Sequence, residues 1–176
     1  MVEPWLRGTL NEIDSVRRQV LHALELTQED AARWCSNLTH EELESCPFDL
    51  PSVGFQLRHM ARSLDRLLTY AEGYQLREVQ RAALASEVTP SDSRDELFQE
   101  FRDGMASAMT RVRAIPAAAY ELTRGVGRDR LPSTVAGLLI HCAEHTQRHT
   151  GQMITTAKVL LAQRRPTEAG QPRPPS

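Results

Sequence analysis

The chain has 176 residues, enough for one domain with a buried core. Apolar residues make up 40% and charged residues 25%, an ordinary composition for a soluble globular protein. The net charge of −2 lacks the basic excess of a general nucleic-acid binder, and no apolar run approaches the roughly 18 residues of a membrane span.

The N-terminus and the cysteines indicate the cellular compartment and the kinds of site to expect. The opening segment MVEPWLRGTLNEID carries acids and no apolar run, so it does not resemble a secretory signal, and we expect a cytoplasmic protein. Cys35, Cys46 and Cys142 lack CxxC spacing, which argues against a disulfide framework or a zinc–thiolate site. We interpret all three as small core or boundary residues.

The first third of the chain has helical rather than strand-like spacing of its apolar residues. A first helix is predicted from about Pro4 to Leu26, because apolar residues recur about one turn apart and proline suits a first helical position. Thr27 and Thr39 are each followed by acidic residues, so we expect them to cap one or two short helices within residues 27–46.

The middle of the chain contains two further long helices. Ser52 is predicted to cap a helix that ends near Gly73, and the short polar segment LREVQRAAL is predicted to form another helix. The segment SEVTPSDS is interpreted as a linker, after which Ser91 or Ser93 caps a helix that reaches about Ile115.

The last third is expected to contain a loop, a long helix and a tail. GVGRDR is interpreted as the loop, and Pro132–Ser133–Thr134 begins a helix that runs to about Gln163. Four long helices with short accessory helices predict an all-α four-helix bundle over residues 1–163. The proline-rich tail, residues 164–176, is expected to be flexible.

The segment HCAEHTQRHTGQ, residues 141–152, places three histidines four residues apart on the last helix. On a helical wheel His149 falls near the middle of the apolar stripe, His145 about 40° to one side and His141 about 40° further out. We therefore expect His145 and His149 to point inward, at a spacing that lets both imidazoles reach one divalent ion. Gln152, one turn beyond His149, is a candidate for orienting a ring or a bound water. The alternative is a pair of hydrogen-bonded core histidines beside a surface histidine.

A metal ion needs a further ligand from another helix, and three histidines are candidates. His40 stands beside acidic residues and is expected to be solvated, whereas His22 lies near the end of the first predicted helix. His59 lies in the middle of the second long helix, roughly 130° from the centre of its apolar stripe. Periodicity by itself does not choose among them.

Two segments carry a resemblance to a known family: GFQLRHMARSLDRLLTYAEG and LLIHCAEHTQRHTGQM. They resemble the second and closing helices of DinB-like (damage-inducible) four-helix-bundle metal-binding proteins, and the resemblance covers about residues 5–162. It implies a metal triad of His59, His145 and His149, with His141 outside it at the rim of the site or behind the ligands. Many family members have an arginine after the final histidine, where this chain has Thr150.

The resemblance also implies chemistry, because several relatives are S-transferases or isomerases that use small thiols such as mycothiol, bacillithiol or glutathione. We therefore expect a divalent metal, zinc first and otherwise nickel, iron or manganese, in a thiol S-transferase for small electrophiles. A metal-dependent hydrolase and a non-enzymatic metal-binding or interaction bundle are the alternatives. Glu144 points away from His145 on the wheel and is expected to be solvated. No catalytic residue is assigned, and we expect a small-molecule substrate, a homodimer, and no nucleic-acid or membrane partner.

Overall fold

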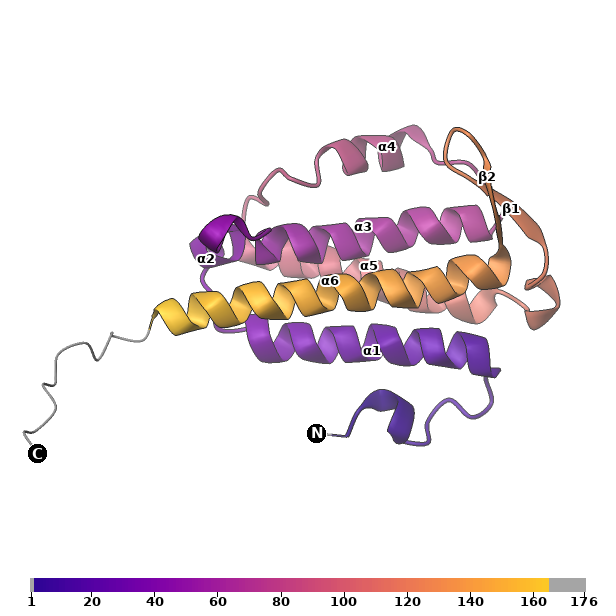
Figure 1. The fold of residues 1–176 in the computed structure, drawn as a ribbon, viewed down its shortest axis with the longest axis horizontal. Coiled ribbons are helices and arrows are strands. Elements are labelled where there is room, and N and C mark those ends of the chain that lie inside the picture. The colour runs from indigo at the N-terminus through magenta and orange to yellow at the C-terminus, as the bar shows by residue number, and fades with distance from the viewer. Residues whose placement is uncertain (1, 165–176) are drawn as a thin grey trace, which may run out of the picture.

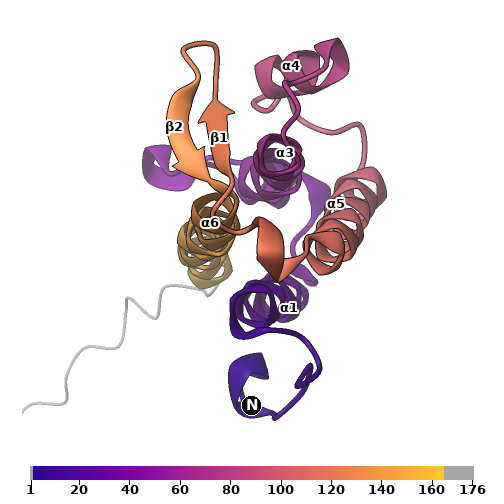
Figure 2. The same cartoon turned by 90° about the vertical axis from the view of Figure 1, so that its right-hand side faces the viewer.

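The computed structural model describes residues 2–164, and four long helices make up most of it. They are α1 (Ser15–Cys35), α3 (Val53–Ala71), α5 (Arg94–Ala114) and α6 (Val135–Gln163). They lie side by side along the long axis of the molecule (Figure 1). Viewed end-on, they form a square in the order α1, α6, α3, α5 (Figure 2). The predicted all-α four-helix bundle is confirmed.

Short elements join the long helices. They are the helices α2 (His40–Glu44) and α4 (Glu78–Ala85), the 3-10 turns η1 (Pro4–Leu6), η2 (Pro47–Asp49) and η3 (Ala117–Ala119), and the strands β1 (Thr123–Val126) and β2 (Leu131–Thr134). Within residues 2–164, no helix has the combination of length and apolar character that crossing a membrane requires.

The core lies along the axis of the bundle and is built from apolar side chains of all four long helices. Its fully buried members include Leu21, Leu24, Leu57, Met60, Leu64, Leu68, Leu97, Met105, Leu139 and Met153. On α3 these residues, Leu57, Met60, Leu64 and Leu68, recur at spacings of three and four, and on α5 Phe101 stands four residues from both Leu97 and Met105, which is the pattern of a single apolar face. Burial of these faces is what holds the helices together.

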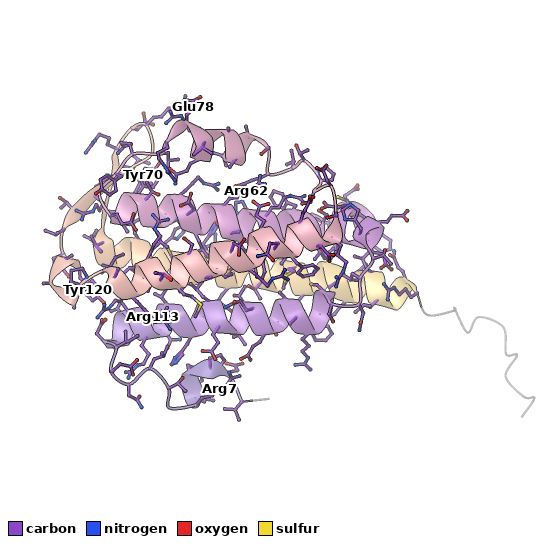
Figure 3. All side chains as sticks on the ribbon, turned by 180° about the vertical axis from the view of Figure 1, so that it is seen from behind. Arg7, Arg62, Tyr70, Glu78, Arg113 and Tyr120 are labelled. Carbon is purple, nitrogen blue, oxygen red and sulfur yellow. The ribbon has the colours of Figure 1, made fainter. Side chains whose placement is uncertain are left out.

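α4 carries the chain back along the outside of α3, so that α5 can run in the same direction as α3 (Figure 1). Arg62 on α3 forms hydrogen bonds with this connection. Figure 3 labels Arg62, which lies beside α4. Its guanidinium donates to the Ala83 carbonyl at 2.9 Å and to Glu100 on α5 at 2.6 Å. One arginine therefore joins α3 to both of the next two helices.

The first long helix begins later than predicted and continues further. Pro4–Leu6 is only a 3-10 turn, and Gly8 and Leu10 then adopt left-handed backbone conformations that turn the chain. The helix starts where the Asp14 side chain accepts a hydrogen bond from the backbone of Arg17 at 3.2 Å. The periodic apolar residues before Asp14 belong to a loop, because spacing alone does not locate a cap.

Thr27 was expected to cap a new helix and instead lies inside α1, fully buried. Its hydroxyl donates to the Ala23 carbonyl at 3.0 Å and lies 2.9 Å from the hydroxyl of Thr150 on α6. A threonine that bonds the preceding turn is satisfied within a helix, so the capping pattern was misleading here. The predicted caps at Thr39, Ser52 and Ser93 are confirmed.

The segment before α6 forms an antiparallel hairpin where the sequence predicted only loop and helix start. Thr123 pairs with Thr134 and Val126 with Leu131, and Gly127 adopts the left-handed conformation of the turn. Each strand has only four residues, none of them fully buried, so neither strand shows the alternation of buried and exposed positions that predicts a strand. Thr134 is the N-cap of α6 and accepts from Gly137 at 3.0 Å, so the helix begins at Val135 rather than at Pro132.

Of the predicted tail, residues 165–176 lie outside the described part of the chain. Arg164, its first residue, is the C-cap of α6 and pairs with Glu42 on α2, with Nε 2.6 Å from Oε1. It also donates to the Asn37 carbonyl at 2.9 Å. The end of α6 is thus joined to the α1–α2 connection.

Candidate metal site

The histidine cluster is built by α3 and α6, which pack against each other. His59 comes from α3 and His145 and His149 from α6, and one ring nitrogen of each lies within 4.8 Å of one from each of the others. The Nε2 atoms of His59 and His145 are 2.9 Å apart. Tertiary structure therefore brings together the three residues that the resemblance implied.

The two α6 histidines lie at the edge of the buried stripe, whereas the wheel placed His149 near its middle. Both are partly buried, and the middle is taken by Thr146 and Thr150, with 0% and 2% exposure. Thr150 can be buried because its hydroxyl donates to the Thr146 carbonyl at 2.8 Å. The edge position places the imidazoles on the side of α6 that packs against α3, with the ring of His149 4.3 Å from that of His59 between centroids.

His59 is oriented by two neighbours. Its Nδ1 lies 2.7 Å from Oε2 of Glu87, which belongs to the segment between α4 and α5. The ring of Phe55, one turn earlier on α3, stacks against its face with 5.4 Å between the centroids and 17° between the planes. The predicted boundary position explains this environment, because the side chain reaches neither the core nor open water.

His149 is oriented by an amide. Its Nδ1 lies 2.7 Å from Oε1 of Gln56, a fully buried residue of α3. The Nε2 of Gln56 donates to Oε1 of Gln152 at 3.1 Å. Gln152 therefore holds the amide of Gln56 that contacts His149, and its role in orienting the ring stays a prediction.

These contacts fix which nitrogens face the centre. A carboxylate and an amide oxygen can only accept, so Nδ1 of both His59 and His149 donates to them, which leaves Nε2 as the ligand atom of each ring. The Nε2 atoms of His59 and His145 are 2.9 Å apart, and all three ligand atoms lie within 4.8 Å of one another. Three imidazole nitrogens this close together are a donor set that fits a transition metal.

Burial keeps two of the three imidazoles, those of His145 and His149, uncharged at neutral pH. Burial, reinforced by His149 and His59, lowers the pKa of His145 to about 4. Burial and the neighbouring His59 likewise lower the pKa of His149 to about 4. Burial would raise the pKa of Glu87, but hydrogen bonds to His59 and Arg66 outweigh it and the pKa lies below its usual range. At neutral pH the imidazoles of His145 and His149 are therefore neutral, and the Glu87 carboxyl is ionised.

His141 lies at the rim, as the wheel predicted. Its ring centroid is 5.4 Å from that of His145, and its side chain is 43% exposed. Glu144 is exposed and turned toward Arg148 and His141, with a carboxylate oxygen 2.6 Å from the Arg148 guanidinium. The expectation that Glu144 is solvated is confirmed.

The other candidate ligands lie elsewhere. His22 is buried beside Thr9, with its Nε2 3.2 Å from the hydroxyl. His40 is partly buried, and its Nδ1 is enclosed without a hydrogen-bond partner, so the expectation of a solvated residue was wrong. Cys35 and Cys142 are buried, which raises the pKa of both thiols to about 12, while Cys46 is exposed.

Sequence reasoning missed Glu87 and Gln56. Gln56 carried a signal, because it is a polar residue one turn before His59 and beside the apolar stripe of α3. Glu87 carried none: it lies in a polar segment interpreted as a linker, and its contact with His59 depends on how α4 folds back over α3.

Two cavities on the other side of α3 belong to a different part of the molecule. One of about 380 Å³ is lined by α3, α4 and α5, and a neighbouring one of about 530 Å³ shares Asp65 and Arg111 with it. Neither is lined by the histidines of the cluster. Arg111, which borders both, is paired with Asp65 at 2.6 Å and with Glu72 at 2.7 Å.

The fold and the cluster define an all-α bundle with three histidines positioned closely enough to hold a metal ion. Comparison with known families agrees: a family model described as the DinB superfamily matches residues 10–153. The chain belongs to the DinB superfamily. A search of curated proteins found no match.

Proposed function

We propose that the protein binds a divalent transition metal, zinc in the first place, through the Nε2 atoms of His59, His145 and His149. The observation that carries the proposal is the convergence of three imidazole nitrogens within 4.8 Å from two helices. The Nδ1 contacts of two of these rings support it, because metal-binding histidines usually donate their second N–H to a carboxylate or carbonyl oxygen. Neutral imidazoles suit zinc, and also nickel or iron.

We further propose that the metal site is catalytic. Among the residues that the structure describes, no fourth histidine, cysteine or carboxylate joins the group. Three protein ligands leave a position for water or a substrate, which is the arrangement of catalytic rather than structural zinc sites. A bound metal would lower the pKa of a thiol or water molecule in that position.

Within that class, a thiol S-transferase that acts on small electrophiles is the activity we propose. His59, His145 and His149 would hold the metal, while Phe55 and Gln56 orient the rings of His59 and His149. Support comes from membership of the DinB superfamily and from the open coordination. The alternatives are a hydrolase that uses metal-bound hydroxide and a bundle that binds metal without catalysis.

The test begins with metal analysis of the purified protein and continues with conjugation of monochlorobimane. We expect about one transition-metal ion per chain and conjugation that requires both a small thiol and the metal. Ester hydrolysis without any thiol would favour the hydrolase. A chain that neither contains a transition metal nor takes one up would overturn the proposal. The homodimer stays a prediction, which light scattering at micromolar concentration measures.

A further inference from the structure

We propose that Glu87 is a positioning residue of the metal site, so that the α4–α5 connection helps to build the site together with α3 and α6. The inference rests on the proposed binding of a metal by His59. It assigns to Glu87 the task of holding the His59 ring in one orientation and strengthening it as a ligand.

The burial of Glu87 is the first observation. Its side chain is 6% exposed, although it stands in a short connection whose neighbours Ser86 and Val88 are exposed. A buried carboxylate is costly unless it is paired and hydrogen-bonded. Glu87 meets this requirement with one oxygen 2.7 Å from Nδ1 of His59 and the other against the guanidinium of Arg66.

The main chain of Glu87 is held as firmly as its side chain. Nε of Arg58 donates to the Glu87 carbonyl at 3.1 Å, and Arg58 is 2% exposed. The remaining nitrogens of Arg58 bind the Glu44 carboxylate at 2.6 and 2.9 Å and the Ser91 hydroxyl at 3.1 Å. Arg58 therefore ties α2 and the α4–α5 connection to α3 immediately beside His59.

Two arginines of α3 form hydrogen bonds with Glu87, the residue that contacts His59. Arg58 fixes the backbone of Glu87, Arg66 fixes one carboxylate oxygen, and the second oxygen is left directed at His59. A carboxylate at Nδ1 selects the tautomer with its lone pair on Nε2 and raises the basicity of the ring. Gln56 gives His149 only a neutral acceptor, so the hydrogen bond that orients His59 is the stronger of the two.

The experiment compares Glu87→Gln with Glu100→Gln in the full chain. Both changes remove the carboxylate that pairs with an arginine of α3, since Glu100 pairs with Arg62, but only Glu87 touches a histidine. Cobalt binding, measured by competition with a chelator, gives the affinity, and the visible spectrum of the cobalt-loaded protein reports the ligand field. Thermal unfolding of the metal-free proteins measures the purely structural cost.

We expect Glu87→Gln to weaken cobalt binding about 10–100-fold and to change the spectrum, while Glu100→Gln alters neither. Glu87→Asp, which retains a carboxylate, should recover part of the affinity. Equal cobalt affinity and identical spectra in wild type and Glu87→Gln would overturn the inference, even if the metal-free variant melted earlier. A wild-type chain that binds no cobalt or zinc would instead overturn the proposed function on which the inference rests.

Discussion

Oε1 of Gln56 lies 2.7 Å from Nδ1 of His149, although the two residues belong to different helices. We expect Gln56→Leu to weaken metal binding about 10-fold or more, because the ring of His149 loses the acceptor that fixes its orientation and tautomer. Chelator competition with zinc or cobalt measures the change. Leucine fills the buried position with a similar volume, so the fold should persist.

The matched control for this change is Gln152→Leu. Gln152 is exposed and its amide oxygen accepts from Gln56, whereas Gln56 is fully buried against the ring, so loss of Gln152 should reduce affinity less. If Gln152→Leu weakened metal binding more than Gln56→Leu, the assignment of Gln56 as the main residue that orients His149 would be wrong.

Substitution of the histidines separates ligands from the rim. We expect His149→Ala to remove most of the bound metal and His141→Ala to remove little, because His149 belongs to the cluster of ligand atoms and His141 lies outside it. The metal content of the purified variants, measured by mass spectrometry, provides the check. Retention of metal by His149→Ala together with its loss from His141→Ala would refute the triad.

The metal-free protein should lose stability as the pH falls from about 6.5 toward 4. In the folded state the pKa values of His145 and His149 are lowered to about 4, whereas in the unfolded chain they return to about 6.5. Below pH 6.5 the unfolded state therefore binds more protons, and the free energy of unfolding decreases until the folded-state pKa is passed. Urea unfolding at pH 7.5, 6 and 5 tests this.

The control for the pH experiment is a chain with both histidines replaced by glutamine, which should show a shallower decline over the same range. The carboxyls of Asp14 and Glu42 do not confuse the result. Hydrogen bonds to Tyr120 and Arg17 outweigh burial and hold the pKa of Asp14 at about 2, and Arg164 does the same for Glu42. Their contribution is lost only below about pH 4.5. An equal decline in the double variant would contradict the assignment.

Replacement by alanine should change the free energy of unfolding in opposite directions at two glycines within helices. A Cβ on Gly104 of α5 would lie 2.6 Å from the Cβ of Ala61, so α3 and α5 would have to separate. We expect Gly104→Ala to cost about 1–3 kcal/mol of the free energy of unfolding. Gly151 of α6 faces open space, and Gly151→Ala should stabilise the chain by about 0.5–1 kcal/mol. Denaturant unfolding of the metal-free proteins measures both, and stabilisation by Gly104→Ala would disprove the close helix contact.

Residue spacing alone predicted the helical architecture and part of the site. The caps at Thr39, Ser52 and Ser93 and the pair His145 and His149 were all recognisable, because each depends on neighbours within one or two helical turns. Backbone geometry sets the period at which side chains return to the same face of a helix, so the spacing of residues in the sequence indicates that face directly. Where the same local rules had two solutions, as at Thr27, the prediction was wrong.

Residue spacing did not choose His59, which the family resemblance implied, and only the tertiary structure shows the environment of the cluster. His22, His40 and His59 all remained candidates by spacing, and only the packing of α3 against α6 places Nε2 of His59 2.9 Å from that of His145. Glu87 meets His59 because α4 folds back over α3 and Arg58 holds the connection. Contacts of this kind join residues distant in sequence through burial and charge pairing, and no periodic pattern records them.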